Sequence, residues 1–390
     1  MKTRLALLAL LLPLPLLADP AEPTTGAFWR DVVVNGDKKI KSFRIPGIAI
    51  TPKNTLIAVY DHRYNNSDDL PGNIDVGMAR STDGGKTWSK TKPIIDFDAS
   101  VKGSNGNGVG DPCVLVDKKT GTIWVAALWS FGNRAWGGSG PGMTKEETGQ
   151  FVLVKSENDG VSWSRPINIT KQVKDPEWRL CFQGPGSGIC TSKGILVFPA
   201  QYRDKSGTEH SFFIYSKDGG KTWKPAPPAA PGKRTTEAQV CETPDGSLLI
   251  SMRNHNSGNR AWAVFRAPGG DLDKGKWEEV YFDIPDPVCA AGLASNPRNL
   301  KQVVFTNPAG PGRSNLTVYL SEDGGKTFPH SRLLQPGAAM YSATTFLPDG
   351  SIGIIYEAGK ADGPKDAMRY ARVTTAWIKA DKNENKDKDE

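Results

Sequence analysis

One eight-residue pattern, Ser-x-Asp-x-Gly-x-Thr followed by an aromatic residue, recurs along this 390-residue chain. It is complete at residues 81–88, 216–223 and 321–328, and a degraded copy lies at residues 156–163. The Asp side chain is suited to accept hydrogen bonds from turn amides, a Gly can take a positive φ, and the aromatic ring can pack beneath a hairpin. The pattern therefore predicts a turn between two strands. Only one acidic position recurs, which is too few for a calcium loop.

A second repeat indicates the fold. Short apolar segments follow turn residues at intervals of about 50 to 75 residues. They are residues 56–60, 122–126, 195–198, 247–251, 302–305 and 351–355. Four antiparallel strands of about 5 to 6 residues, with their turns, fill one such interval and make one propeller blade. The sequence therefore predicts an all-β fold, a six-bladed β-propeller, and the 42 Gly and 29 Pro suit so many turns and exclude a coiled coil.

This strand register gathers polar side chains at one rim. In an antiparallel blade, the start of the first strand and the end of the second strand share a rim, whereas the aspartate turns join strands three and four at the other rim. A single charged residue at such an edge is usually only solvated. Seven equivalent positions together argue for a site at one mouth of the central channel: Arg44, Asp111, Glu237 and Tyr341 at first-strand starts, and Arg63, Arg253 and Glu357 at second-strand ends.

The two ends of the chain differ from its middle. Lys2 and Arg4 precede an apolar run, which is typical of a secretory signal peptide over residues 1–18 and is too short to span a bilayer. Residues 379–390 are mostly charged, with Ala380 as the one apolar residue, so we expect a disordered tail there. These features predict an exported protein, periplasmic or extracellular, with no transmembrane segment and one domain over residues 27–378.

Charge and reactive side chains exclude other classes. The net charge is +7, but the basic residues are dispersed, which does not favour nucleic-acid binding and does suit an anionic ligand. The four His residues have no metal-ligand spacing, so we expect neither a metal nor a cofactor. The five Cys residues are widely spread, which favours buried thiols and leaves a Cys181–Cys190 disulfide open. We expect a monomer.

A short motif connects these features to a known family. Phe43-Arg44-Ile45-Pro46, followed by the aspartate turns, resembles the exo-α-sialidases (neuraminidases) of the bacterial and animal type over residues 27–378. The turns alone are weak evidence, since they occur in unrelated extracellular proteins. The motif together with correctly ordered acidic, Arg and Tyr residues is specific. The resemblance implies a six-bladed propeller that hydrolyses terminal α-linked sialic acids from glycoproteins, glycolipids and oligosaccharides.

The resemblance implies residues that bind the substrate. Arg44, Arg253 and Arg313 would form a triad around the substrate carboxylate, because planar guanidinium groups bind carboxylates bidentately. Glu357 would orient Arg44. The positions on the 4-hydroxyl and acylamino side of the sugar would be Arg63 and Asp111.

The resemblance also implies catalytic residues. Tyr341 would be the nucleophile and Glu237 its base, in a retaining reaction through a tyrosyl-enzyme intermediate. A neutral nucleophile avoids part of the repulsion that a carboxylate would meet from the sialic acid carboxylate. The acid/base residue would be Asp69, which precedes Leu70-Pro71, with Asp68 as the alternative.

Other interpretations stay open from the sequence. A trans-sialidase would have the same residues and a sugar as acceptor. A non-catalytic sialoglycan-binding propeller would keep the arginines but lose the acid/base residues. Trp129, Trp136 and Met143 follow a second-strand end and could contact the aglycone or glycerol chain, although packing is the commoner role for such side chains.

Overall fold

A computed structural model describes residues 26–36, 39–97, 108–230, 232–256, 258–359 and 365–380. The predicted signal peptide, residues 1–18, lies outside the described residues, and so do residues 381–390 of the predicted tail. Lys379, the first residue of that tail, is the last residue of the short helix α2 (Thr375–Lys379).

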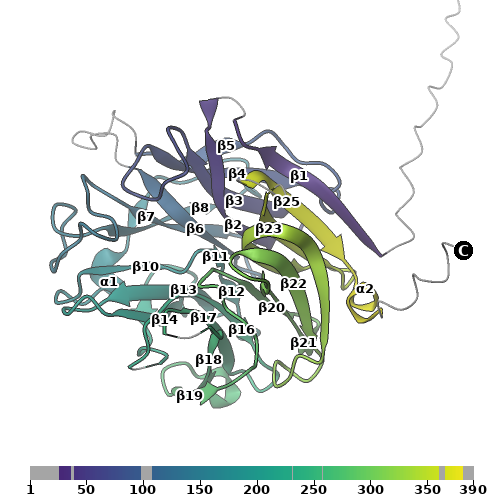
Figure 1. Cartoon of the computed structure of the whole chain (residues 1–390). Coiled ribbons are helices and arrows are strands. Elements are labelled where there is room, and N and C mark those ends of the chain that lie inside the picture. The colour runs from purple at the N-terminus through teal and green to yellow at the C-terminus, as the bar shows by residue number, and fades with distance from the viewer. Residues whose placement is uncertain are drawn as a thin grey trace, which may run out of the picture.

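The described residues form an all-β fold, as predicted, with 25 strands in five hydrogen-bonded sheets (Figure 1). One sheet has β2 (Ser42–Ile50), β3 (Leu56–Arg63), β4 (Ile74–Ser81) and β5 (Lys92–Ile95). The next has β6 (Val109–Val116), β7 (Ile123–Trp129), β8 (Gln150–Ser156) and β9 (Ile167–Asn168), with β11 (Gly186–Ser187) parallel to β6. A third has β10 (Leu180–Gln183), β13 (Leu196–Arg203), β14 (Glu209–Ser216) and β15 (Lys224–Pro225), with β12 (Ile189–Cys190) paired to β13. A fourth has β16 (Thr235–Glu242), β17 (Leu248–Asn254), β18 (Ala261–Arg266) and β19 (Lys276–Val280).

The fifth sheet has seven strands because one long strand, β23 (His330–Phe346), pairs with two groups of strands in turn. Its strands are β20 (Gly292–Asn296), β21 (Asn299–Pro308), β22 (Ser314–Ser321), β23, β24 (Ile352–Gly359), β25 (Lys365–Val373) and β1 (Ala27–Val34). The first part of β23, up to Ala338, pairs with β22, and the part from Ala339 pairs with β24. Hydrogen bonding thus gives five sheets where the sequence predicted six blades.

The six apolar segments predicted from the sequence all lie, to within one residue, in strands at equivalent places. They fall in β3, β7, β13, β17, β21 and β24, each the second strand of its group of four. All eight residues of β3 are buried, since neighbouring sheets cover both of its faces. Short helical segments also lie at α1 (Thr170–Val173) and at the 3-10 turn η2 (Pro268–Gly270).

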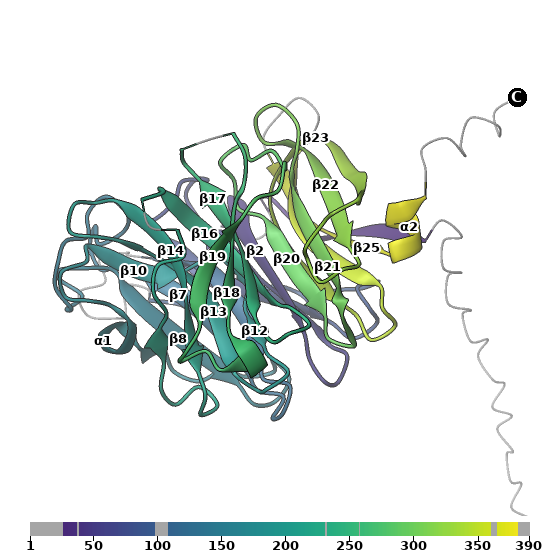
Figure 2. The same cartoon turned by 90° about the horizontal axis from the view of Figure 1, so that it is seen from below.

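The inner strands form a closed ring. β2 contacts β6, β6 contacts β12, β12 contacts β16, β16 contacts β20, β20 contacts β23, and β23 returns to β2. The N-terminal strand β1 pairs with β25, so the start of the domain completes the sheet formed by its end (Figure 1). Helix α2 lies at the outer edge, against β22 and β23 (Figure 2).

The aspartate turns have the predicted role. All four connect third and fourth strands, namely β4 to β5, β8 to β9, β14 to β15 and β22 to β23. In the first turn, Asp83 accepts hydrogen bonds from the Thr87 amide at 3.0 Å and the Thr87 hydroxyl at 2.6 Å. Gly84 and Gly85 have φ of 72° and 93°, and Trp88 packs against Tyr370, 5.3 Å between ring centroids.

All five Cys residues are buried and free, so Cys181 and Cys190 do not form the disulfide that the sequence left undecided. Among the described residues, no helix has both the length and the apolar character needed to cross a membrane.

Candidate active site

Four inner strands are irregular where the sequence predicted site residues. The pairing register shifts after Arg44 in β2, after Gly110 in β6, after Thr236 in β16 and after Ala339 in β23. Ile45, Asp111 and Glu237, which lie within these shifts, have positive φ values of 62°, 58° and 20°. An extra residue in a strand bends it and turns side chains in new directions. Register shifts in four strands at one rim, three of them with a positive φ, mark this rim as the candidate site.

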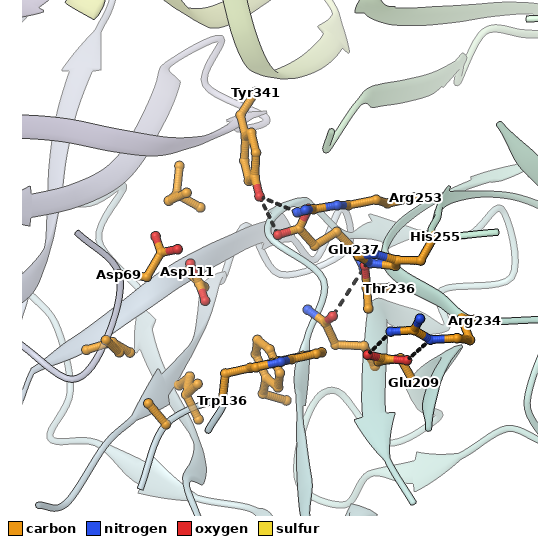
Figure 3. Close-up of a pocket in the computed structure, with 16 residues that line it drawn as sticks. Asp69, Asp111, Trp136, Glu209, Arg234, Thr236, Glu237, Arg253, His255 and Tyr341 are labelled. Atoms are coloured by element: carbon orange, nitrogen blue, oxygen red, sulfur yellow. Dashed lines mark hydrogen bonds and ion pairs between the residues drawn. The ribbon is translucent and has the colours of Figure 1, made fainter. Parts of the chain in front are cut away.

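Tyr341 and Glu237 meet directly at this rim. The Tyr341 hydroxyl donates a hydrogen bond to Glu237 Oε1 at 2.5 Å (Figure 3). Arg253 NH1 donates to Glu237 Oε2 at 2.7 Å and to the Tyr341 oxygen at 2.9 Å. Burial, and then the Glu237 charge, raise the pKa of Tyr341 well above its ordinary value. The phenol is therefore neutral, and its proton points at a carboxylate.

Two further arginines flank Tyr341. The Cζ atoms of Arg44 and Arg313 lie 5.5 and 5.6 Å from the centroid of the Tyr341 ring. Arg44 Nε donates to Glu357 Oε1 at 2.7 Å, and Arg313 donates to the carbonyl of Val288 at 2.8 Å. The structure thus brings the three predicted arginines together around one tyrosine, with Glu357 behind Arg44.

Electrostatics keep these groups cationic. Burial lowers the pKa of Arg44, but the Glu357 carboxylate more than offsets this, so the pKa lies above its ordinary value. For Arg253, burial also lowers the pKa, and Glu237 and Tyr341 raise it further than burial lowers it. Arg253 Nε is buried and has no acceptor among the described residues. Buried donors normally have partners, so this atom is suited to an incoming anion.

Asp69 lies on the opposite side of the site from Arg253 (Figure 3). Its carboxylate is 2.8 Å from Arg63 NH1, and its side chain is 76% exposed. It lines the cavity, whereas Asp68 does not line it and bonds to Asn66. The geometry therefore favours Asp69 over Asp68 as the residue that can reach a ligand.

Asp61, a buried residue to which the sequence analysis assigned no role, holds Arg63 and Asp111 on the Asp69 side of the site. Asp61 accepts hydrogen bonds from Arg63 NH2 at 2.9 Å and from the Asp111 amide at 2.9 Å. Burial raises the pKa of Asp61 to about 6 although Arg63 lowers it. Burial, followed by the charges of Asp61 and Asp69, raises the pKa of Asp111 well above its ordinary value. Asp61 and Arg63 are two apart in β3, so their shared face was the signal for this contact.

These side chains open into a cavity of about 410 Å³. Five predicted residues line it: Asp69, Asp111, Glu237, Arg253 and Tyr341. Trp136 also lines it, whereas Trp129 is buried and stacks on Phe97 at 4.3 Å between centroids, and Met143 is absent from the lining. Packing is therefore the role of Trp129.

The far end of the cavity holds polar residues that the sequence analysis missed. Arg234 forms two hydrogen bonds with Glu209, at 2.8 and 2.9 Å, and Thr236 bonds to His255 at 2.9 Å (Figure 3). Glu209 is the first residue of β14, a third strand. Third-strand starts share the rim of second-strand ends, so the same register argument could have found it. Among the described residues, no cluster of three or more His, Cys, Asp or Glu is suited to a metal ion.

Comparisons with known proteins agree with this geometry. The model of the BNR repeat-like domain matches residues 55–354. The sialidase of Bacteroides fragilis is 45% identical over 354 residues, covering 87% of this chain and 64% of the relative. The sialidase of Micromonospora viridifaciens is 31% identical over 366 residues, covering 90% of this chain and 54% of the relative. The chain thus spans less than two thirds of either relative.

A solved structure agrees with both relatives. The Hadza microbial sialidase Hz136 matches with a TM-score of 0.82 and 40% identity, over 90% of this chain and 69% of that one. With its aspartate turns, its Phe-Arg-Ile-Pro motif and these matches, the chain belongs to the sialidase family.

Proposed function

We propose that this chain is a retaining exo-α-sialidase that hydrolyses terminal α-linked sialic acids from glycoproteins, glycolipids and oligosaccharides. The observation that carries the proposal is the 2.5 Å hydrogen bond from Tyr341 to Glu237, with three arginines around the same tyrosine. Membership of the sialidase family supports the substrate class.

The first step is binding of the substrate carboxylate by Arg44, Arg253 and Arg313. A planar guanidinium group can bind a carboxylate through two parallel hydrogen bonds. The attraction between the two charges is stronger at a buried site than at an exposed one. The buried, unpartnered Nε of Arg253 supports this role. Arg63 and Asp111 then contact the 4-hydroxyl and acylamino side of the sugar.

The second step forms a covalent intermediate. The Tyr341 oxygen attacks the anomeric carbon while its proton passes to Glu237. The bond from the anomeric carbon to the leaving oxygen breaks, and Asp69 gives that oxygen its proton. An ordinary phenol has a pKa near 10, and the pKa of Tyr341 is higher still, so a base in contact with its proton is needed.

The third step releases the sugar. Asp69, now a carboxylate, takes a proton from water as the water oxygen attacks the anomeric carbon. The Tyr341 oxygen leaves and recovers its proton from Glu237. Two displacements at one carbon restore the starting configuration, so the product is the α-anomer.

We also infer that the fold is the six-bladed propeller expected from the sequence. The first part of β23 would complete the blade of β20 to β22, and the second part would begin the blade of β24, β25 and β1. The change of partner between Ala338 and Ala339 and the closed ring of inner strands support this count.

A sialoside assay with product identification tests the proposal. The protein is incubated with a mixture of α2,3- and α2,6-linked sialoglycans, with lactose as an added acceptor, and the products are separated. We expect free sialic acid as the main product. New sialylated lactose would favour a trans-sialidase, and binding of the sialoglycan without turnover would favour the non-catalytic propeller.

A further inference from the structure

A buried ion pair lies behind the candidate site, and neither of its members lines the cavity. Arg260 NH1 is 3.2 Å from Asp286 Oδ2, and the two side chains are 0% and 1% exposed. Arg260 directly precedes β18, and Asp286 lies in the segment between β19 and β20. Removing two charges from water is unfavourable unless further hydrogen bonds satisfy them. The remaining hydrogen bonds of this pair show which parts of the molecule it holds.

Arg260 holds the backbone of the candidate base. Its NH2 group donates to the carbonyl oxygen of Glu237 at 3.3 Å, and its Nε donates to Ser251 Oγ at 2.8 Å. Glu237 lies within a register shift and has a φ of 20°, which a side chain-bearing residue adopts only when its surroundings enforce it. The guanidinium group of Arg260 is one of these enforcing contacts.

Asp286 and Arg260 together hold the backbone next to Arg253 and the segment of residues 286–289. Asp286 Oδ2 accepts the amide hydrogen of Asn254, the neighbour of Arg253, at 3.1 Å. Cys289 donates its amide hydrogen to Asp286 Oδ1 at 3.0 Å, and its carbonyl accepts from Arg260 NH1 at 2.5 Å. Residues 286–289 are therefore clamped at both ends.

The segment of residues 286–289 contains Val288, whose carbonyl group binds Arg313. Val288 has a φ of 56°, an unusual conformation for a β-branched residue. Its carbonyl oxygen is the acceptor for Arg313 NH2, at 2.8 Å. The position of Arg313 thus depends on a strained backbone that the ion pair encloses.

We propose that Arg260 and Asp286 are positioning residues for the proposed sialidase reaction, on which this inference rests. Their ion pair fixes the backbone behind three side chains of the site: Glu237, Arg253 and Arg313. A pair of apolar side chains could fill the same space and often supports a fold equally well. Only the charged pair can also hold the carbonyl groups of Glu237 and Cys289 and the amides of Asn254 and Cys289.

Two variants test the proposal. Arg260→Lys keeps the charge beside Asp286, but one ammonium group cannot reach all the acceptors that the guanidinium group serves. The double variant Arg260→Met with Asp286→Leu removes both charges and leaves none unpaired. The matched control is Arg80→Lys, because Arg80 also bonds an aspartate of a distant segment: Asp159, at 2.7 Å, lies in the degraded aspartate turn between β8 and β9.

We expect both variants to fold, with wild-type circular dichroism and cooperative melting. We expect kcat for an aryl sialoside to fall about 100-fold in Arg260→Lys, since a displacement of about 1 Å in a reacting group has that effect. The double variant should lose kcat and also raise KM, because it releases the segment behind Arg253 and Arg313. Arg80→Lys should keep wild-type kcat and KM.

The results separate positioning from stability. A folded Arg260→Lys protein with wild-type kcat and KM would overturn the proposal. So would a loss of rate that matches only the unfolded fraction. Crystal structures of the wild-type and Arg260→Lys proteins give a readout that does not need turnover: we expect the Tyr341–Glu237 hydrogen bond to be longer in the variant than in the wild type. If the wild-type protein cleaves no sialoside, the proposed function fails, and this distance still tests the positioning role.

Discussion

Glu357 accepts a hydrogen bond from Arg44 at 2.7 Å, although the two residues are 313 positions apart in the sequence. The same carboxylate oxygen accepts the amide hydrogen of Ile45 at 2.9 Å. Glu357 is fully buried in β24, and Arg44 lies in β2, so this contact joins the sheet at the end of the domain to the sheet near its start. The guanidinium group of Arg44 is therefore held in place before any ligand arrives.

This geometry predicts that a lysine cannot replace any arginine of the triad. Arg44→Lys, Arg253→Lys and Arg313→Lys each keep one positive charge but lose the planar fork. We expect kcat/KM for a fluorogenic sialoside to fall about 10- to 100-fold in each variant, the value of one or two charge-assisted hydrogen bonds. Arg369→Lys, at a partly exposed ion pair with Asp31, is the control. Wild-type kinetics in all three triad variants would refute the assignment.

The acid/base assignment predicts a dependence on the leaving group. A general acid matters most when the leaving group is poor. Asp69→Asn should therefore slow cleavage of a natural sialoglycan far more than cleavage of an aryl sialoside, and Asp68→Asn should slow neither. The measurement is the ratio of kcat/KM for the two substrates. If Asp68→Asn alone changes this ratio, the acid is Asp68.

The aspartate turns should matter for stability and not for catalysis. Asp83→Ala removes the acceptor of the Thr87 amide and hydroxyl on the rim away from Tyr341. We expect the free energy of unfolding to fall by about 1 to 2 kcal/mol, as for one or two net hydrogen bonds. Urea unfolding measures this change. A fall in kcat of the folded variant would instead connect this turn to the reaction.

Buried His62 should contribute less to stability in mild acid than at neutral pH. Its ring bonds to Thr91 Oγ1 at 2.7 Å, and burial lowers the pKa of His62 to about 4. The unfolded chain takes up this proton near pH 6.5, so the contribution of the neutral ring is fully present above pH 6.5. It is lost as the pH falls to about 4 and amounts to about 3 kcal/mol.

His62→Gln keeps a hydrogen-bonding side chain and cannot titrate. Unfolding free energies of wild type and variant, measured from pH 7 to pH 4, should therefore converge or cross as the pH falls. Parallel curves over this range would show that His62 is protonated equally in both states.

Local chemistry explains what could be predicted from the sequence. The apolar segments and aspartate turns depend on neighbours in the chain, and the structure confirms them as second strands and third-to-fourth connections. The five hydrogen-bonded sheets differ from the six predicted blades because β23 pairs first with β22 and then with β24. This continuation depends on the two partner strands rather than on the residues of β23 itself.

In the candidate site, too, some features could be predicted from the sequence and others could not. Equivalent strand positions predicted that Arg44, Glu237, Arg253 and Glu357 share a rim with Tyr341, whereas Arg313 was predicted only from the family resemblance. The register shifts at Arg44 and Glu237 were not predictable, since one extra residue in a strand leaves no clear pattern. Asp61 and Arg260 were missed because buried polar residues show their partners only after distant segments pack together.

The most direct measurement is the identification of the residue that carries the sugar during turnover. A fluorinated sialosyl donor slows hydrolysis of the intermediate, so the adduct can be digested and its mass assigned by peptide mapping. We expect the added mass on the peptide that contains Tyr341, and no adduct in folded Tyr341→Phe, which lacks only the phenolic oxygen. An adduct on Glu237 or Asp69, or product released as the β-anomer, would contradict the mechanism.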